Sequence, residues 1–252
     1  MNKLPLLHHP IDAIVFDCDS TLSKVEGVDE LAKMNNCWEA VHKMTNDAMS
    51  DTGVNNSLYR ERLELVQPTY KQMCELGKIY YEHRTDDICA TIDFLTKLDK
   101  KIFIISAGLL PPVVEFGKML GIAESAIYAV DIYFDEKGNY KDYEENSLLT
   151  RMNGKRTIIS ELMEFYPKII HIGDGLNDIE AKEVVTRFIG YGGVAYRENI
   201  AKVSDCYVTH PSMLSILPLC LTHEEVSNLE QEQFEVFQQG VKFLQQWSHV
   251  HE

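Results

Sequence analysis

The stretch "IDAIVFDCDSTLSKVEG", residues 11–27, places two carboxylates directly after an apolar run. Residues 11–16 are rich in Ile, Val and Phe, a composition that predicts a buried strand. Asp17 and Asp19 follow, and alternation along a continued strand would point both side chains to the same face. Because ligands of open α/β sheets bind beyond the carboxyl ends of the strands, this stretch predicts a polar site at the end of a core strand.

Two further expected strands end in polar residues. "KIFIISAG" (101–108) carries Ser106, and "KIIHIGDG" (168–175) carries Asp174, with Asp178 shortly afterwards. If the three strands are neighbours, their carboxylates and a hydroxyl converge on one crevice. Two like charges ~4 Å apart repel by on the order of 4 kcal/mol near a protein surface, and a cation relieves that cost. An all-oxygen cluster with room for a phosphate suits Mg²⁺, so we expect a magnesium site here.

Such a cluster suits chemistry on phosphate esters. One of Asp17 and Asp19 can attack phosphorus while the other transfers protons. The attacking carboxylate and the ester repel each other, and Mg²⁺ together with a nearby lysine reduces that repulsion. Lys155, in "NGKRT" at the start of an expected helix, supplies that lysine.

The rest of the chain divides into a helical insertion and an α/β pattern. Residues 26–83 are mostly polar, with apolar residues at helical spacing and few strand-like runs. Strands and helices then alternate, which predicts a parallel sheet with helices on both faces. We therefore expect an α/β protein with a Rossmann-like, doubly wound parallel sheet core and an inserted all-helical domain. The predicted boundaries are 1–23 and 86–221 for the core, 24–85 for the insertion and 222–252 for a C-terminal helix.

Individual elements follow from the same patterns. The expected helices cover 28–49, 56–66, 68–84, 111–121, 154–166 and 177–185, and the further strands lie within 126–143, 187–193 and 205–210. Pro68 is expected in the first turn of its helix, and a turn is expected at Gly138. Thr222 and Glu225 form a capping-box pattern, and we favour packing of this last helix on its own domain over binding of a partner. His171 is expected to be a hydrogen-bonded core residue.

Composition sets limits on partners and location. The chain has 252 residues, 45% of them hydrophobic, which can supply a proper core. Its formal net charge of −15 disfavours nucleic acid and anionic membranes as partners, and no apolar run is long enough to span a bilayer. The six cysteines form no CxxC pair, and the N-terminal apolar run is too short for a signal peptide. We therefore expect reduced thiols and a cytoplasmic location, and leave a homodimer open.

Four motifs occur in the order that marks a known superfamily. "FDCDST", Ser106 in "ISAG", Lys155 and "GDGLND" resemble the motifs of the haloacid dehalogenase superfamily, and the DxDxT form is similar to that of its phosphotransferases. "DSTLSKVEGVDELAK", "RLELVQP", "IGDGLNDIEA" and "FIGYGG" also resemble the phosphoserine phosphatase family. This resemblance covers about residues 11–218 and implies that the helical insertion is a cap that closes over the substrate.

The resemblance implies a role for each motif. Asp17 is implied as the nucleophile that becomes aspartyl phosphate, and Asp19 as the general acid and then the general base. Asp17, the backbone carbonyl of Asp19, and Asp174 would bind Mg²⁺, with Asp178 supporting the metal. Ser106 and Lys155 would hold the phosphoryl oxygens, and Asn177 would orient the site. Ala107 and Gly108 are also implied to bind the substrate.

The same resemblance implies that the cap recognises an amino-acid phosphate. Glu26 would meet the substrate amine, Arg62 its carboxylate in the bidentate manner that arginine favours, and Met49 would line the pocket. The expected substrate is O-phospho-L-serine, a small phosphomonoester.

Three departures from the family pattern keep the substrate open. Ala107 stands where these phosphatases usually have glycine, Asn55 where they carry a phenylalanine, and Ser50 and Asp51 replace a more permissive cap segment. A phosphatase for another small amine-bearing phosphate is therefore the first alternative. A second alternative, from another class, is a non-catalytic phosphometabolite-binding or scaffold protein that uses its C-terminal helix.

Overall fold

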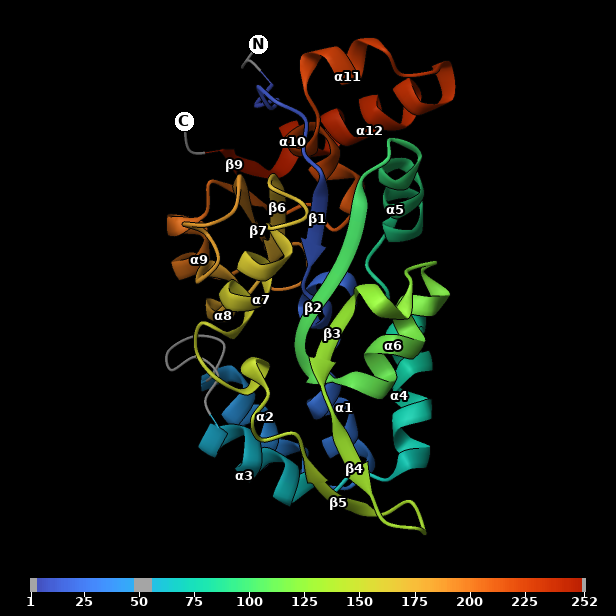
Figure 1. Ribbon diagram of the computed structural model, residues 1–252, viewed down its shortest axis with the longest axis vertical. Helices are drawn as coiled ribbons and strands as arrows, with labels where there is room; N and C mark the ends of the chain where they lie inside the picture. Colours follow the sequence, from blue (N-terminus) through green and yellow to red (C-terminus); the bar gives the residue numbers. More distant parts are fainter. Residues whose placement is uncertain (1–3, 48–55, 251–252) are drawn as a thin grey trace.

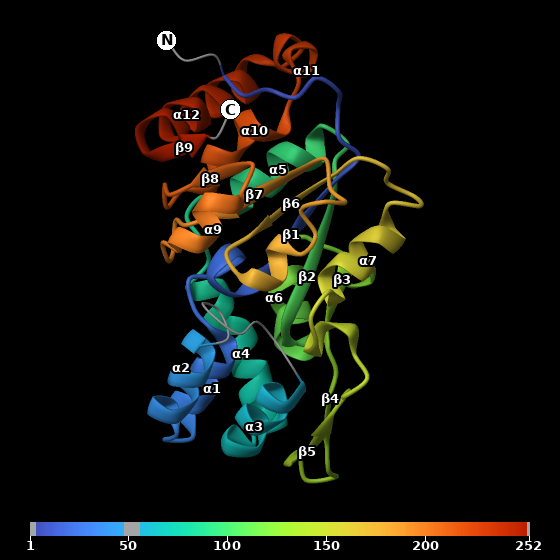
Figure 2. The same ribbon diagram turned by 90° about the vertical axis from the view of Figure 1, so that its left-hand side faces the viewer.

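A mostly parallel sheet forms the centre of the molecule (Figures 1 and 2). The computed structural model describes residues 4–47 and 56–250. Strands β3, β2, β1, β6, β7 and β8 run parallel in that order, and β9 joins the edge antiparallel to β8. The strands are β1 (Ala13–Phe16), β2 (Lys101–Leu109), β3 (Ile127–Val130), β6 (Ile169–Gly173), β7 (Arg187–Tyr191), β8 (Cys206–Val208) and β9 (Ser248–Val250). The predicted α/β class and parallel sheet are confirmed.

The three strands expected to carry the site are neighbours. β1 lies between β2 and β6, with Phe16 level with Ile104 on one side and Ile172 on the other. All of β1 is buried, as its apolar run predicts. The carboxyl ends of these strands therefore meet at one edge of the sheet, and in Figure 1 the arrow of β1 points toward that edge.

The chain leaves β1 before the two aspartates. The strand ends at Phe16, and Cys18–Leu22 form an irregular turn, η1, in which Asp19 has extended backbone angles and Ser20 has a φ of 52°. The prediction that strand alternation sets the directions of Asp17 and Asp19 is therefore wrong, because neither residue is in the strand. The turn instead gives each carboxylate its own surroundings.

Helices cover both faces of the sheet (Figure 1). α5 (Ile88–Lys97) and α6 (Leu110–Met119) lie on one face, and α7 (Gly154–Leu162), α8 (Leu176–Ile179) and α9 (Glu198–Val203) lie on the other. Right-handed crossovers require this division, because the chain moves outward from β1 to β3 and in the opposite direction from β6 to β8.

Several helix boundaries differ from the predicted ones. α7 ends at Leu162 rather than at Tyr166, which precedes Pro167 and is biased away from helical geometry. α8 ends at Ile179 and is followed by turns, although the apolar spacing favoured a helix to 185. Helices α5 and α9 were not among the expected elements.

The inserted segment forms four helices at the carboxyl edge of the sheet, which we call the cap (α1–α4). They are α1 (Gly27–Met34), α2 (Trp38–Asp47), α3 (Asn56–Val66) and α4 (Tyr70–Glu82). The single helix expected over 28–49 is wrong, because Asn36 takes a left-handed φ of 57° and separates α1 from α2. Pro68 also lies before its helix, since Thr69 is the N-cap of α4.

A two-stranded hairpin from the core lies beside the cap (Figure 2). β4 (Ile132–Phe134) pairs antiparallel with β5 (Tyr140–Tyr143), and Gly138 has a φ of 80° in the connecting turn, as its sequence predicted. The Tyr143 ring of the hairpin packs at a tilt against the Tyr59 ring of α3, with centroids 5.0 Å and planes 44° apart. The Arg60 guanidinium lies 3.1 Å from the Glu145 carboxylate. The hairpin and the cap are therefore packed together.

The C-terminal segment packs at the opposite end of the molecule from the cap (Figure 1). The expected single helix is two, α11 (His223–Ser227) and α12 (Gln231–Trp247), followed by β9. The predicted capping box of Thr222 and Glu225 opens α11. α12 packs on η5 (Met213–Ile216) and α10 (Leu217–Cys220) and buries Phe237 and Leu244. The C-terminal segment thus packs on its own domain, as the sequence analysis favoured.

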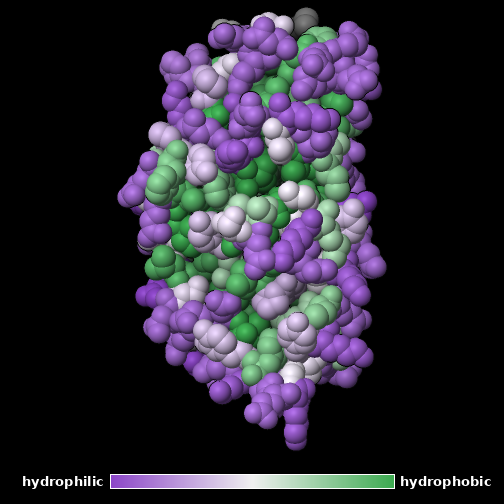
Figure 3. Space-filling model, turned by 45° about the vertical axis from the view of Figure 1, so that its right-hand side comes forward, coloured by the Kyte–Doolittle hydropathy of each residue, from purple (hydrophilic) through white to green (hydrophobic). Residues whose placement is uncertain are grey.

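On one face of the molecule, the surface is mostly polar at both ends (Figure 3). Figure 3 shows apolar side chains across the middle of one face, with hydrophilic side chains covering the two ends. Among the described helices, none combines the length and the hydropathy that crossing a bilayer requires. All six cysteines are unpaired.

Candidate active site

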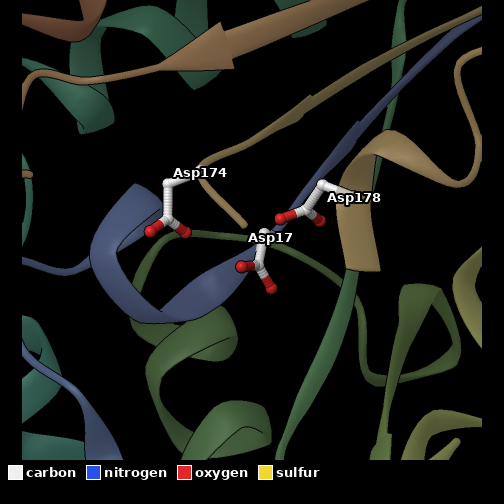
Figure 4. Close-up of side chains that lie close together, drawn as sticks. All are labelled: Asp17, Asp174 and Asp178. Atoms are coloured by element: carbon white, nitrogen blue, oxygen red, sulfur yellow. The ribbon is translucent and has the colours of Figure 1, made fainter. Parts of the chain in front are cut away.

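Three buried carboxylates converge at the carboxyl edge of the sheet. Asp17 follows β1, Asp174 follows β6, and Asp178 lies on α8; Figure 4 shows the three side chains facing a common space. One oxygen from each lies within 4.8 Å of the others. Their sequence separation of more than 150 residues is bridged by the parallel pairing of β1 with β6. The convergence expected from the sequence is present for these three residues.

Lys155 lies against two of these carboxylates. Its Nζ is 2.6 Å from Asp17 Oδ1 and 2.6 Å from Asp178 Oδ1, and the side chain is only 2% exposed. Burial disfavours its charged form, but the two carboxylates outweigh burial and raise the pKa of Lys155. The side chain reaches this position because α7 begins at Gly154, where the sequence placed a helix start. Lys155 is therefore a fixed positive charge beside Asp17.

The three carboxylates differ in proton affinity. Burial and the charge of Asp178 raise the pKa of Asp17 well above its usual range, although Lys155 opposes them. Burial raises the pKa of Asp174 to about 6 despite the nearby Arg197. Burial acts in the same direction on Asp178, but Lys155 and His171 outweigh it and lower the pKa of this carboxyl. Asp178 is thus the carboxylate that the protein itself keeps ionised.

Two partners of this cluster were missed by the sequence analysis. Arg197, just before α9, donates from Nε to Asp174 Oδ2 at 3.0 Å, and a second guanidinium nitrogen lies 3.0 Å from the same oxygen. Nothing in "AYREN" marks this arginine, because its contact depends on how α9 returns to the sheet. His171 is buried and hydrogen-bonded, as predicted, but its Nε2 lies 3.0 Å from Asp178 Oδ1, which links it to the site.

Asp19 lies apart from the three-carboxylate cluster and has its own donors. Its Oδ1 accepts the Gly27 N–H at 2.6 Å and the Tyr80 O–H at 2.8 Å. Its Oδ2 lies 3.4 Å from the Ser106 hydroxyl. Burial raises the pKa of Asp19, and the hydrogen bonds from Gly27 and Tyr80 oppose that shift. The fourth expected carboxylate therefore has different hydrogen-bond partners from those of Asp17.

The "SAG" segment of β2 closes this side of the site. Ser106 is fully buried within the strand rather than at its end, and its hydroxyl accepts the Gly108 N–H at 2.9 Å. A Cβ at Gly108 would lie within 3.0 Å of Asp19 Oδ2 and Ser106 Oγ, so only glycine fits there without displacing them. Ala107 is half-buried between them.

Asn177 lies in the first turn of α8, directly before Asp178. Its side chain is 8% exposed, and it comes from the same short helix that carries the third carboxylate. The predicted phosphoryl-binding residues Ser106, Lys155 and Asn177 are therefore all buried and all come from the carboxyl edge of the sheet or the helices that begin there.

Glu26 lies at the entrance of the cap and faces the core site. Its Oε1 accepts the Ser20 hydroxyl at 2.5 Å. Burial and the nearby charges of Asp19 and Asp174 raise the pKa of Glu26 to about 8, while Ser20 and Arg197 oppose the shift. Glu26 is half-buried, and a carboxyl with a raised pKa gains from a cationic partner, because a positive charge would restore its ionised form.

Arg62 is the second buried charge from the cap. It is 7% exposed, its guanidinium carbon lies 5.6 Å from the centre of the Tyr59 ring, and its Nε has no hydrogen-bond partner among the described residues. The hydroxyl of Tyr59 likewise has none there. Met49, and the departures at Ser50, Asp51 and Asn55, lie outside the described residues.

The site and the fold define a class. A family model for haloacid dehalogenase-like hydrolases matches residues 11–183, and the chain belongs to this family. Among curated relatives, it is 33% identical over 210 residues to phosphoserine phosphatase from Homo sapiens, covering 82% of this chain and 93% of that protein. It is 29% identical to the chloroplastic phosphoserine phosphatase of Arabidopsis thaliana, covering 79% and 69% respectively.

Solved structures share the fold. A phosphoserine phosphohydrolase-like protein from Francisella tularensis aligns with a TM-score of 0.72 at 24% identity, covering 79% of this chain and 95% of that one. A phospho-aspartyl intermediate analogue of phosphoserine phosphatase aligns with a TM-score of 0.74 at 22% identity, covering 84% and 99%. The predicted resemblance to the phosphoserine phosphatase family is confirmed, and the chain is a phosphoric monoester hydrolase.

Proposed function

We propose that this protein is a Mg²⁺-dependent phosphatase that hydrolyses O-phospho-L-serine through an aspartyl-phosphate intermediate on Asp17. The observation that carries the proposal is the contact of Asp17 with Lys155 beside two further buried carboxylates. A lysine in this position holds the nucleophile and offers positive charge to a phosphoryl group. A binding protein would gain nothing from a separate, independently held carboxylate such as Asp19.

The donor set of the cluster fits Mg²⁺. Asp17, Asp174 and Asp178 supply oxygen ligands only, which hard cations prefer. The raised pKa values of Asp17 and Asp174 reflect burial and mutual repulsion that a divalent cation would relieve. When bound there, Mg²⁺ would neutralise charge on the phosphoryl oxygens.

The residues then divide the work of hydrolysis. A carboxylate oxygen of Asp17 forms a bond to phosphorus as the bond from phosphorus to the leaving oxygen breaks. Asp19 donates a proton to the leaving alkoxide, and its resulting carboxylate takes a proton from the water that later attacks the aspartyl phosphate. Lys155 and Ser106 hold the phosphoryl oxygens during both steps. Inorganic phosphate and the alcohol are the products, and Asp17 and Asp19 return to their starting states.

The two charges from the cap support an amino-acid substrate. Glu26 is a half-buried carboxyl with a raised pKa that a substrate ammonium would pair, and Arg62 is a buried guanidinium whose Nε has no partner among the described residues and would pair a substrate carboxylate. Leaving either charge without its partner costs about 1–3 kcal/mol or more. Phosphoserine carries both complementary groups on a primary alcohol.

A panel of phosphomonoesters with Mg²⁺ tests the proposal. Phosphoserine should give the highest kcat/KM, followed by phosphoethanolamine, which lacks the carboxylate, and then glycerol phosphate, which lacks both groups. A preference for phosphoethanolamine would favour the first alternative, another amine-bearing phosphate. Binding of these esters without hydrolysis of any of them would favour the non-catalytic alternative.

Location and assembly stay predictions. The cytoplasmic location, the absence of nucleic-acid and membrane partners, and the open question of a homodimer follow from composition. One of the relatives is a chloroplastic protein, so family membership by itself does not decide the compartment.

A further inference from the structure

Tyr80 places a phenol hydroxyl at the proposed acid–base carboxylate. The residue lies in the last turn of α4 and is 1% exposed. Its ring stacks on Phe116 of α6, with centroids 5.6 Å apart and planes 30° apart. Its hydroxyl donates to Asp19 Oδ1 at 2.8 Å. The ring is thus held in place by packing, and its hydroxyl donates to Asp19 Oδ1.

Asp19 Oδ1 receives a second donor from the other end of the cap. The Gly27 N–H, at the start of α1, donates to the same oxygen at 2.6 Å. A Cβ at Gly27 would overlap the Tyr80 hydroxyl, so the glycine leaves the space that the phenol occupies. The chain enters the cap near Gly27 and leaves it soon after Tyr80. One donor from each of these two connections therefore binds the same carboxylate oxygen.

The two oxygens of Asp19 are therefore unequal. Oδ1 accepts two short hydrogen bonds, which use both of its lone pairs. Oδ2 has one longer contact, 3.4 Å from the Ser106 hydroxyl, on the side where Ser106 and Gly108 line the site. A proton carried by this carboxyl belongs on Oδ2, because Oδ1 has no lone pair left to bond it.

We infer that Tyr80 is a positioning residue for Asp19, fixing its side-chain orientation so that Oδ2 delivers and receives the proton. The inference rests on the proposed role of Asp19 as the general acid and base. No contact between Tyr80 and substrate is required, because the phenol acts through the carboxylate.

Tyr80→Phe tests the inference because it removes only the hydroxyl and keeps the ring on Phe116. Protonation by Asp19 matters for an alkoxide leaving group and little for 4-nitrophenolate, which leaves without help. We expect kcat/KM for phosphoserine to fall by about tenfold or more, mostly in kcat, and kcat/KM for 4-nitrophenyl phosphate to fall by less than about threefold. A general loss of structure would instead lower kcat/KM for both esters by the same factor.

Tyr191→Phe is the matched control. Tyr191 is fully buried, and its hydroxyl donates to the Pro211 carbonyl at 2.8 Å, in the core and away from Asp19. This variant should leave the ratio of the two esters at the wild-type value. If Tyr80→Phe leaves the ratio of kcat/KM for the two esters at the wild-type value, with or without an equal loss on both, the inference is overturned.

Two further measurements separate this inference from the proposed function. In kcat/KM, which reports formation of the aspartyl phosphate, Asp19→Asn should show the same selective loss on phosphoserine, to a larger extent. An equal loss of kcat/KM on both esters would remove the role of Asp19 as the general acid. The crystal structure of Tyr80→Phe is independent of turnover. If the wild type cleaves no phosphomonoester, the proposed function fails, and the structure alone decides: a rotated Asp19 carboxylate supports positioning by Tyr80, and an unchanged one overturns it.

Discussion

The cap and the C-terminal segment are both helical and lie at opposite ends of the sheet, yet they bury different kinds of side chain (Figure 1). The cap brings Arg62 and Tyr80, which are buried, and Glu26, which is half-buried, toward the carboxyl edge of the sheet. The C-terminal segment buries Phe237 and Leu244 against the opposite end. Helical periodicity is the same in both regions and does not distinguish them.

The difference lies in what the buried polar groups bind. In the C-terminal segment, Glu225 pairs with Lys100 at 2.5 Å and also completes its own capping box, so its charge is fully used by the protein. In the cap, the Arg62 Nε has no partner among the described residues. A buried polar atom that the protein itself does not satisfy is expensive, which is why such atoms accumulate where a ligand binds. The unpartnered Arg62 Nε therefore supports the proposal that the cap recognises the substrate, whereas the contacts of the C-terminal segment stabilise the fold.

The largest effect should come from the strand end between these two regions. Asp17→Asn should lower kcat by more than about a thousandfold, because an amide is a poor nucleophile and the other residues cannot replace a covalent step. Steady-state assay with phosphoserine measures it. Asp12→Asn, an exposed aspartate just before β1, is the matched control and should retain activity. Appreciable turnover by folded Asp17→Asn would rule out the covalent mechanism.

Removal of Mg²⁺ should abolish turnover, and its addition should stabilise the protein more at high pH than at low pH. The pKa of Asp174 is raised to about 6 from an ordinary value of 3.8, so the folded protein holds an extra proton between these values. Stability from this group is present below about pH 4 and is lost as pH rises through about 6. A cation competes with that proton, so it binds better above about pH 6.

Thermal unfolding with and without MgCl₂ checks this dependence. A cation at a hundred times its Kd adds about 2.7 kcal/mol to the free energy of unfolding. The increase in Tm should be clearly larger at about pH 7.5 than at about pH 5.5. Equal increases at the two pH values, or full activity after exhaustive chelation, would argue against a metal at these carboxylates.

A smaller and more selective effect is expected in the cap. Arg62→Ala should raise KM for phosphoserine about tenfold or more, which corresponds to about 1.4 kcal/mol or more of lost binding. Glycerol phosphate, which has no carboxylate, should change little. Arg60→Ala is the matched control, because Arg60 lies on the same helix but is only half-buried and pairs with Glu145 of the core. Equal KM changes for both esters in Arg62→Ala would remove the carboxylate role.

The smallest effect on catalysis is expected in the C-terminal segment. Truncation after Leu221 removes Phe237 and Leu244, and burial of such side chains contributes about 1.5–3 kcal/mol each. The free energy of unfolding should fall, while kcat and KM of the folded fraction should stay near the wild-type values. Phe237→Ala should lower stability by about 3–5 kcal/mol and likewise leave KM unchanged. A stable truncated protein that has lost activity would show that the C-terminal segment contributes to catalysis and not only to stability.

The sequence predicted the core of the site because its signals are local. β1 and β6 are short apolar runs that end in aspartate, and parallel pairing brings Asp17 and Asp174 together once the strands are neighbours. Lys155 was found because a helix start places it. Each of these residues depends on an element whose type is written in the adjacent sequence.

The missed contacts depend on the return of distant segments. Tyr80 meets Asp19 across 61 residues of sequence, and Arg197 meets Asp174 through the placement of a helix that was itself not predicted. The break at Asn36 was missed because a single left-handed residue leaves the apolar spacing on either side intact. Local propensity and periodicity carry no information about such contacts, since tertiary packing selects them.

Because the β4–β5 hairpin packs against the cap, an exchange of the cap with that of a relative must include the hairpin. The Tyr143 ring packs against Tyr59, and the Tyr70 N–H donates to the Gly138 carbonyl at 2.9 Å, so the hairpin supplies part of the surface that the cap helices contact. A chimera that takes only residues 24–85 from another phosphatase would set foreign helices against these tyrosines. A graft that carries residues 131–145 along with the helices keeps both halves of that contact, and it is the natural module for transplanting substrate preference onto a new core.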